Sequence, residues 1–163
     1  VGLREGRVKA ADAVRGVAWD IIAFLFFIFV TALGLENIGV TRTMANVYAT
    51  QAAEPQGGIS VIGGMSALGS AVLNNHPMAA LNALAIGSID GDNRFRTLAA
   101  LVGGDLGPRL LPIGSLAGLL WLEMMRRLGV EIRAVQFMRV GALVTLPTLA
   151  ASLAVLWLEA WLF

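Results

Sequence analysis

The sequence contains no cysteine and little charge, and both absences narrow what the protein can be. Without cysteine, disulfide bonds and thiolate metal sites within the chain are excluded, and the redox compartment stays undetermined. Charged residues make up 14% of the 163 residues, whereas a soluble domain carries about 25%. Hydrophobic residues make up 57% of the chain, and the mean hydropathy is +0.75. This composition indicates a membrane protein.

A strong excess of positive charge is also absent, since the formal net charge is +1, and nothing predicts a nucleic-acid partner. The sequence shows no paired catalytic carboxylates, no nucleophile–base set, no phosphate-binding loop and no metal-ligating cluster. We therefore expect a protein that is not an enzyme and that has no cofactor or metal. Residues 1–18 are polar and basic and show no signal peptide. Because the chain starts at Val1 rather than Met, we expect a piece of a longer protein.

Two apolar runs are typical of membrane-spanning helices, because a bilayer core about 30 Å thick needs about 20 apolar helical residues. Residues 19–35 are apolar on every face of a helix, so we expect them to contact lipid. Residues 137–162 are also long enough to span. Pro147 lies inside this second run, where membrane helices tolerate a kink.

A third apolar region, residues 58–87, is divided by the sequence Asn74-Asn75-His76-Pro77. Each arm would be about 15–24 Å long at about 1.5 Å per residue, too short to span comfortably. Pro77 suits the first turn of a second helix, because its missing N–H has no partner there anyway. The region therefore predicts a re-entrant helical hairpin, whose backbone must be enclosed by protein or line a water-filled cavity.

A fourth region, residues 95–125, is interrupted by Gly103-Gly104-Asp105-Leu106-Gly107-Pro108. Three glycines and a proline in six residues, with Gly103 and Pro108 at the ends, predict a break in the helix. An interrupted helix beside a re-entrant hairpin points to a transporter binding site near the membrane midplane. The predicted fold class is an all-α membrane protein with a re-entrant hairpin and a discontinuous helix.

Basic residues predict the orientation, since lysine and arginine gather in cytoplasmic loops. They precede the first and the last predicted spans, whereas the expected loop 36–57 carries a single arginine, Arg42; the two basic groups are Arg4, Arg7, Lys9 and Arg15, and Arg126, Arg127, Arg133 and Arg139. We therefore expect a multi-pass protein of the bacterial inner membrane with a cytoplasmic N-terminal segment and a C-terminus outside. The hairpin would then enter from the outer side.

The hairpin tip offers polar groups to a solute. Asn74 and Asn75 can bind a neutral polyol-like solute or replace the hydration shell of an ion, or they can simply cap the turn. His76 could carry a proton near neutral pH, or it could be a structural residue that fills the tip.

The break offers an acid and small residues. Asp105 is a candidate for solute binding and proton coupling, because an acid at membrane depth indicates function; the alternative is a structural ion pair with Arg109. Gly104 and Gly107 allow close approach of a solute or tight helix packing. Ser115 is a further lining candidate.

Several motifs resemble the bacterial arsenite/antimonite efflux permeases of the ion transporter superfamily. Residues 74–78 (NNHPM) and 83–86 (ALAI) resemble that family's "NN-x-P … AL-x-I" stretch. Residues 104–117 (GDLGPRLLPIGSLA) resemble its "DLGPK-x-TPIGSLATLLW" signature, and residues 145–147 (TLP) resemble its last-helix motif. The similarity covers nearly the whole chain in register.

The resemblance implies export of arsenite or antimonite, as As(OH)₃ or Sb(OH)₃, in exchange for protons. It implies that Asn74 and Asn75 contact the solute and that Asp105 is a site acid. It also implies that residues 1–163 are the C-terminal repeat and form one half of an inverted-repeat transporter. A missing N-terminal repeat or a second copy would complete the pathway. A soluble arsenical ATPase is a further partner in some systems, and membrane lipid surrounds the protein.

The chain departs from the family pattern at His76, Gly104, Arg109, Leu111 and Glu123. These departures leave the substrate open. Related permeases carry sodium, dicarboxylates, sulfate or silicate, so an anion, dicarboxylate or sodium/proton transporter is one alternative. A non-transporting membrane assembly subunit is another.

Overall fold

The structure is a computed structural model that describes residues 19–51 and 55–162, and within these ranges it contains helices and turns but no strand. The predicted all-α fold is therefore confirmed. The helices are α2 (Trp19–Asn37), α3 (Val40–Gln51), α4 (Pro55–Leu73), α5 (Asn75–Gly87), α6 (Arg94–Leu106), α7 (Leu116–Arg127) and α8 (Ala134–Leu162), and two short 3₁₀ turns, η1 (Gly107–Leu110) and η2 (Pro112–Gly114), join α6 to α7. The basic residues expected before the first span lie outside the described residues.

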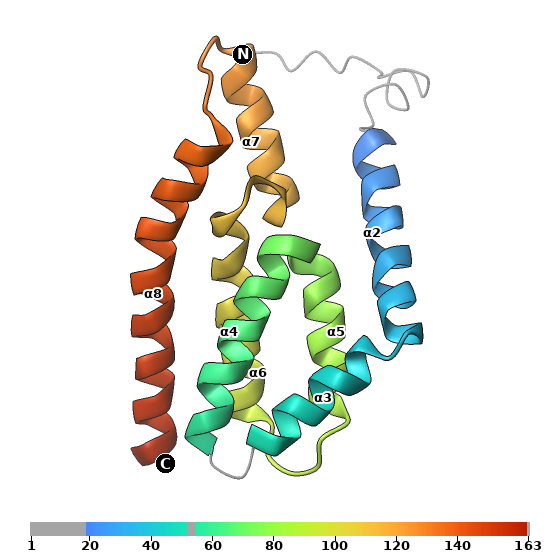
Figure 1. Cartoon of the computed structure of the whole chain (residues 1–163), viewed down its shortest axis with the longest axis vertical. Coiled ribbons are helices and arrows are strands. Elements are labelled where there is room, and N and C mark those ends of the chain that lie inside the picture. The colour runs from blue at the N-terminus through green and yellow to red at the C-terminus, as the bar shows by residue number, and fades with distance from the viewer. Residues whose placement is uncertain (1–18, 52–54, 163) are drawn as a thin grey trace, which may run out of the picture.

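The helices differ in how far they reach along the molecule (Figure 1). Helix α8 runs from one end to the other, and α6, the two 3₁₀ turns and α7 together cover the same height. Helices α4 and α5 form a hairpin that turns back near mid-height, beside the 3₁₀ turns. The start of α2 and the α7–α8 connection lie at one end, and the last turn of α8 lies at the other.

The tightest packing joins α4 to α6, because small residues recur every fourth position on both helices. A Cβ added to Gly103 would overlap the carbonyl oxygen of Gly63, and one added to Gly107 would overlap that of Ala67. The backbones of the two helices are therefore in direct contact, as is common where small residues line membrane helix interfaces.

The prediction of a loop over residues 36–57 was wrong, because the structure places α3 there. Helix α3 is amphipathic: Met44 and Tyr48, one turn apart, are both buried in the core, whereas Arg42 and Asn46 are exposed. Its low overall hydropathy made it resemble a loop. The buried stripe packs α3 against α4 and α5.

Among the described helices, α8 by itself is long and apolar enough to cross a membrane. Helices α2 and α3 meet the same criterion only as a pair bent by 66°. Pro147 lies inside α8, which continues as helix on both sides. Large apolar side chains on α2 and α8 are exposed, including Phe27 and Leu143. Water disfavours such surfaces, so they require lipid or another protein segment.

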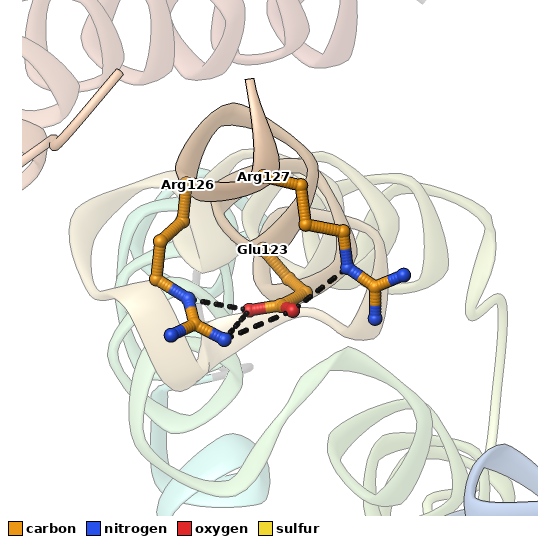
Figure 2. A network of polar contacts seen from close by, with 3 residues as sticks. All are labelled: Glu123, Arg126 and Arg127. Carbon is orange, nitrogen blue, oxygen red and sulfur yellow. Dashed lines mark hydrogen bonds and ion pairs between the residues drawn. The ribbon is translucent and has the colours of Figure 1, made fainter. Parts of the chain in front are cut away.

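The last turn of α7 is polar and exposed. The carboxylate of Glu123 accepts hydrogen bonds from Arg126, at 2.9 and 3.0 Å, and from Arg127, at 2.9 Å (Figure 2). The two arginine side chains are 71% and 77% exposed. Such a cluster suits an aqueous boundary, and pairs this exposed contribute little to stability.

Candidate functional site

The hairpin tip is fixed to the interrupted segment by Asn74. Its φ of 81° and ψ of 152° define a strained backbone conformation that glycine normally adopts. The side chain is buried, and its amide donates a hydrogen bond to the carbonyl of Ile113 at 3.3 Å. Its carbonyl accepts from the backbone N–H of His76 at 3.5 Å, which caps α5. Asn74 therefore holds the tip against the 3₁₀ turns.

The helical path is interrupted between Leu106 and Leu116, so the predicted break at residues 103–108 begins too early: Gly103, Gly104 and Asp105 are still part of α6. Leu111 and Ser115 are extended, and each 3₁₀ turn has a proline in its first turn, where no N–H is needed. The Ser115 hydroxyl accepts from the N–H of Gly118 at 3.0 Å and so caps α7. Four helix ends thus lie near the tip: the C-terminal ends of α4 and α6 and the N-terminal ends of α5 and α7. Their unpaired backbone groups and dipoles create a polar environment there.

A cavity of about 460 Å³ lies between α5 and α6. It brings together four of the predicted site residues from two separate sequence regions: Asn75, His76, Gly104 and Asp105. The rest of its wall is mostly small or apolar. Polar groups are therefore spread along a largely apolar space, a mixture that is typical of small-molecule sites.

Asn75 lines this cavity and is half-buried there. Its side-chain oxygen is buried and accepts no hydrogen bond from any described residue. Leaving a buried acceptor unsatisfied costs about 1–3 kcal/mol.

Asp105 lies in the last turn of α6, with its side chain exposed along the cavity wall. An acid at this end of a helix is opposed by the helix dipole, so its position does not serve helix stability. Among the described residues, Asp105 forms no ion pair with Arg109, which was the structural alternative. Arg109 instead lines a separate apolar pocket with Trp121 and Phe137.

His76 and Gly104 complete this part of the wall. The His76 ring is exposed, and its Nδ1 lies 3.4 Å from the side-chain oxygen of Asn74. A Cβ added to Gly104 would meet only the Ser70 hydroxyl oxygen, at 3.7 Å, which is ordinary contact. Gly104 thus has free space beside it, unlike Gly103 and Gly107, which are in direct contact with the backbone of α4.

The remaining predicted residues lie outside the cavity. Asn74 is at the tip, Gly107 and Gly103 pack against α4, and Ser115 caps α7. Pro77 is buried in the first turn of α5, and Pro108 begins the 3₁₀ segment.

Three polar residues of the cavity wall were missed from the sequence: Asn82, Asn93 and Thr97. Asn82 could have been found, because it lies seven residues after Asn75 and so on the same face of α5. It is buried in a network whose partners are on other helices: it accepts from the Tyr48 hydroxyl at 2.8 Å and donates to the Ser66 hydroxyl at 2.9 Å. No sequence spacing indicates those partners.

Comparison with a family model and comparison with individual proteins indicate the same family. The family model described as arsenical pump membrane protein matches residues 3–162. An arsenical pump membrane protein of Escherichia coli is 34% identical over 156 residues, covering 91% of this chain and 36% of the relative. One from Escherichia coli strain K12 is 32% identical over 163 residues, covering 96% of this chain and 37% of the relative.

A more distant relative, an uncharacterized transporter of Mycobacterium tuberculosis, is 29% identical over 174 residues, covering 99% of this chain and 39% of that protein. The chain therefore spans little more than a third of the length of the relatives it matches. No solved structure matches it.

Proposed function

The chain belongs to the arsenical pump membrane protein family, and from this premise we propose that it forms one half of the solute pathway of an inner-membrane arsenite and antimonite exporter. The observation that carries the proposal is the cavity between α5 and α6, where Asn75, His76, Gly104 and Asp105 come together. These residues belong to two separate polar interruptions of apolar sequence. Their convergence on one cavity is what a solute pathway requires and what a scaffold does not.

The chemistry of the wall favours a neutral, hydroxylated solute. Arsenous acid carries three hydroxyl donors and no charge at pH 7, and the side-chain amides of Asn75 and Asn82 in the cavity wall are groups that can exchange hydrogen bonds with them. No lysine or arginine is among the described residues that line the cavity. Arg109, the basic residue nearest in sequence to Asp105, lines a different pocket. A sulfate or dicarboxylate would need a cation or several aligned N–H donors there. This disfavours the anion alternatives.

Asp105 is the proposed proton carrier. Its carboxylate shares the cavity with the solute groups and has no ion-pair partner among the described residues. Binding of a proton there would change the charge of the site between inward and outward steps, which couples the two movements. His76, in the same wall, is the second candidate for this role.

The proposed membrane arrangement treats α4 and α5 as a re-entrant hairpin and α6–α7 as one discontinuous span. Its support is that the hairpin turns back at mid-height beside the break. The end of α7, with Arg126 and Arg127, and the α7–α8 connection would face the cytoplasm, and the C-terminus would lie outside. The other half of the pathway would come from an N-terminal repeat or a second copy, and a soluble ATPase is a proposed partner.

Transport of radiolabelled arsenite into everted membrane vesicles tests the proposal, with an imposed proton gradient as the driving force. We expect Asp105→Asn to reduce proton-driven uptake more than tenfold, an effect of about 1.4 kcal/mol or larger. Asn75→Ala should raise KM with a smaller effect on the maximal rate. Asp90→Asn, an exposed acid outside this cavity, is the matched control.

Wild-type rates in both cavity variants would contradict the proposed pathway. Parallel assays with sulfate, and with a sodium gradient in place of the proton gradient, separate the alternative transporters. A membrane assembly subunit predicts that Asp105→Asn leaves cellular arsenite resistance unchanged at equal protein levels.

A further inference from the structure

A buried hydrogen-bonded relay connects the cavity wall to two helices that do not line the cavity. Tyr48 on α3 donates to the side-chain oxygen of Asn82 on α5, and the Asn82 amide donates to Ser66 on α4. All three residues are at most 4% exposed. Asn82 lines the cavity, whereas Tyr48 and Ser66 do not.

The two bonds fix the orientation of the Asn82 amide at the cavity wall. Its oxygen is used by Tyr48, and one of its two N–H groups is used by Ser66. No described residue accepts the second N–H. An amide held by partners on two other helices cannot rotate freely, and a preoriented donor loses less entropy when a ligand binds.

Asn75 lies on the same face of α5, seven residues earlier, or about 10 Å along the helix axis. Ala79 lies between the two amides and also lines the cavity, so the space between them is open. One end of this stripe carries the Asn75 amide, whose oxygen has no hydrogen-bond partner among the described residues, and the other end carries the Asn82 amide. A hydroxylated solute, which both donates and accepts, matches this pair.

We propose that Asn82 is a solute-binding residue of the cavity and that Tyr48 and Ser66 are positioning residues that hold its amide toward the solute. The inference rests on the proposed function, because it assigns further residues to the same site. It also gives α3 a role in solute binding, although α3 contributes no cavity-lining side chain.

The test measures the KM and the maximal rate of arsenite uptake in everted vesicles containing the full-length protein. Tyr48→Phe removes only the hydroxyl and keeps the buried ring, and Ser66→Ala removes the other partner. Each should raise KM about three- to tenfold, the effect of one misplaced hydrogen bond, with the maximal rate within about twofold of wild type.

Ser70→Ala is the matched control, because Ser70 lies one turn after Ser66 on α4, is equally buried, and its hydroxyl has no partner among the described residues. Its KM should stay within about twofold of wild type, since no hydrogen bond is lost. An equal rise in Ser70→Ala and Ser66→Ala would overturn the relay in favour of a general packing effect.

A double-mutant cycle separates positioning from stability. If Tyr48 acts through Asn82, Tyr48→Phe should have no further effect on KM in an Asn82→Ala background. If Asn82→Ala does not accumulate in the membrane, Asn82→Ser serves as the background. Equal KM increases in both backgrounds, or no increase in Tyr48→Phe alone, would overturn the relay.

The two proposals fail in different ways. If Asn75→Ala and Asp105→Asn impair uptake but the Tyr48 and Ser66 variants do not, the relay is wrong and the pathway stands. If all of these variants transport as wild type, or the wild-type protein moves neither arsenite nor antimonite, both proposals fall.

Discussion

Helix α6 has two faces built from similar small residues, and they do opposite things. On one face, Gly103 of α6 and Gly107, the C-cap residue that begins η1, bring the backbone into contact with Gly63 and Ala67 of α4. On the other face, Gly104 borders the cavity and leaves it open. Adjacent residues in a helix are rotated by about 100°, so neighbouring glycines can face a packed seam and an open site. The tight contact between α4 and α6, here called the seam, supports the binding site, because it keeps the cavity wall from moving into the cavity.

The largest effect should come from filling the seam. Gly107→Val places a branched side chain where the Ala67 carbonyl already lies, and backbone cannot move aside as a flexible side chain can. We expect a loss of about 3 kcal/mol or more in the free energy of unfolding, at the upper end for overpacking. Thermal unfolding in detergent, together with the amount of protein in the membrane, measures this. A wild-type melting temperature would show that the two helices are not in contact there.

An intermediate effect is expected at Asn74, where the packed and hollow regions meet. Asn74→Ala keeps the positive φ without the side-chain bonds to Ile113 and His76, so we expect a destabilisation of about 1–3 kcal/mol. Asn74→Gly relieves the backbone strain but still loses the bonds, so it should cost less. The order of the two melting temperatures tests the reason, and a lower value for glycine than for alanine would contradict it.

A smaller effect on stability, with a clear effect on transport, should follow from filling the hollow face. Gly104→Ala adds a methyl group whose nearest neighbour is 3.7 Å away, so the free energy of unfolding should change by less than about 1 kcal/mol. The methyl group borders the cavity beside Asp105, so arsenite uptake should fall severalfold. Comparison with Gly107→Val at equal protein levels sharpens the contrast between the two faces. Loss of folded protein in Gly104→Ala would place this position in the seam as well.

The smallest effect is expected outside both regions, at the exposed end of α7. Glu123→Gln removes the carboxylate that bonds Arg126 and Arg127, yet all three side chains are in contact with solvent (Figure 2). Water can replace these interactions, so neither the melting temperature nor arsenite uptake should change measurably. A large drop in uptake would mean that this cluster contacts another part of the transporter.

The sequence predicted the apolar segments well because burial in a membrane leaves a strong local signal. The regions 58–87, 95–125 and 137–162 each correspond closely to described helices or helix pairs. The sequence-based prediction missed α3, because that helix is short and amphipathic. Its buried face becomes apparent only when α4 and α5 cover it. Among the proposed site residues, Asn75, His76, Gly104 and Asp105 line the cavity, and Asn74 takes the capping role that was its alternative. The bond from Asn74 to Ile113 and the capping role of Ser115 could not be foreseen.

The sequence alone determined that the chain is helical and apolar and that two polar, glycine- and proline-rich interruptions divide its helices, since these properties depend on each residue and its near neighbours. Only the tertiary structure decided which glycines pack and which stay open, that Asn74 bonds to Ile113, and that Tyr48 and Ser66 hold Asn82. The reason is that these contacts join residues at least 16 positions apart in the sequence, and 39 positions apart in the case of Asn74 and Ile113. Whether such groups meet depends on the rotation and crossing of whole helices, which no local pattern specifies.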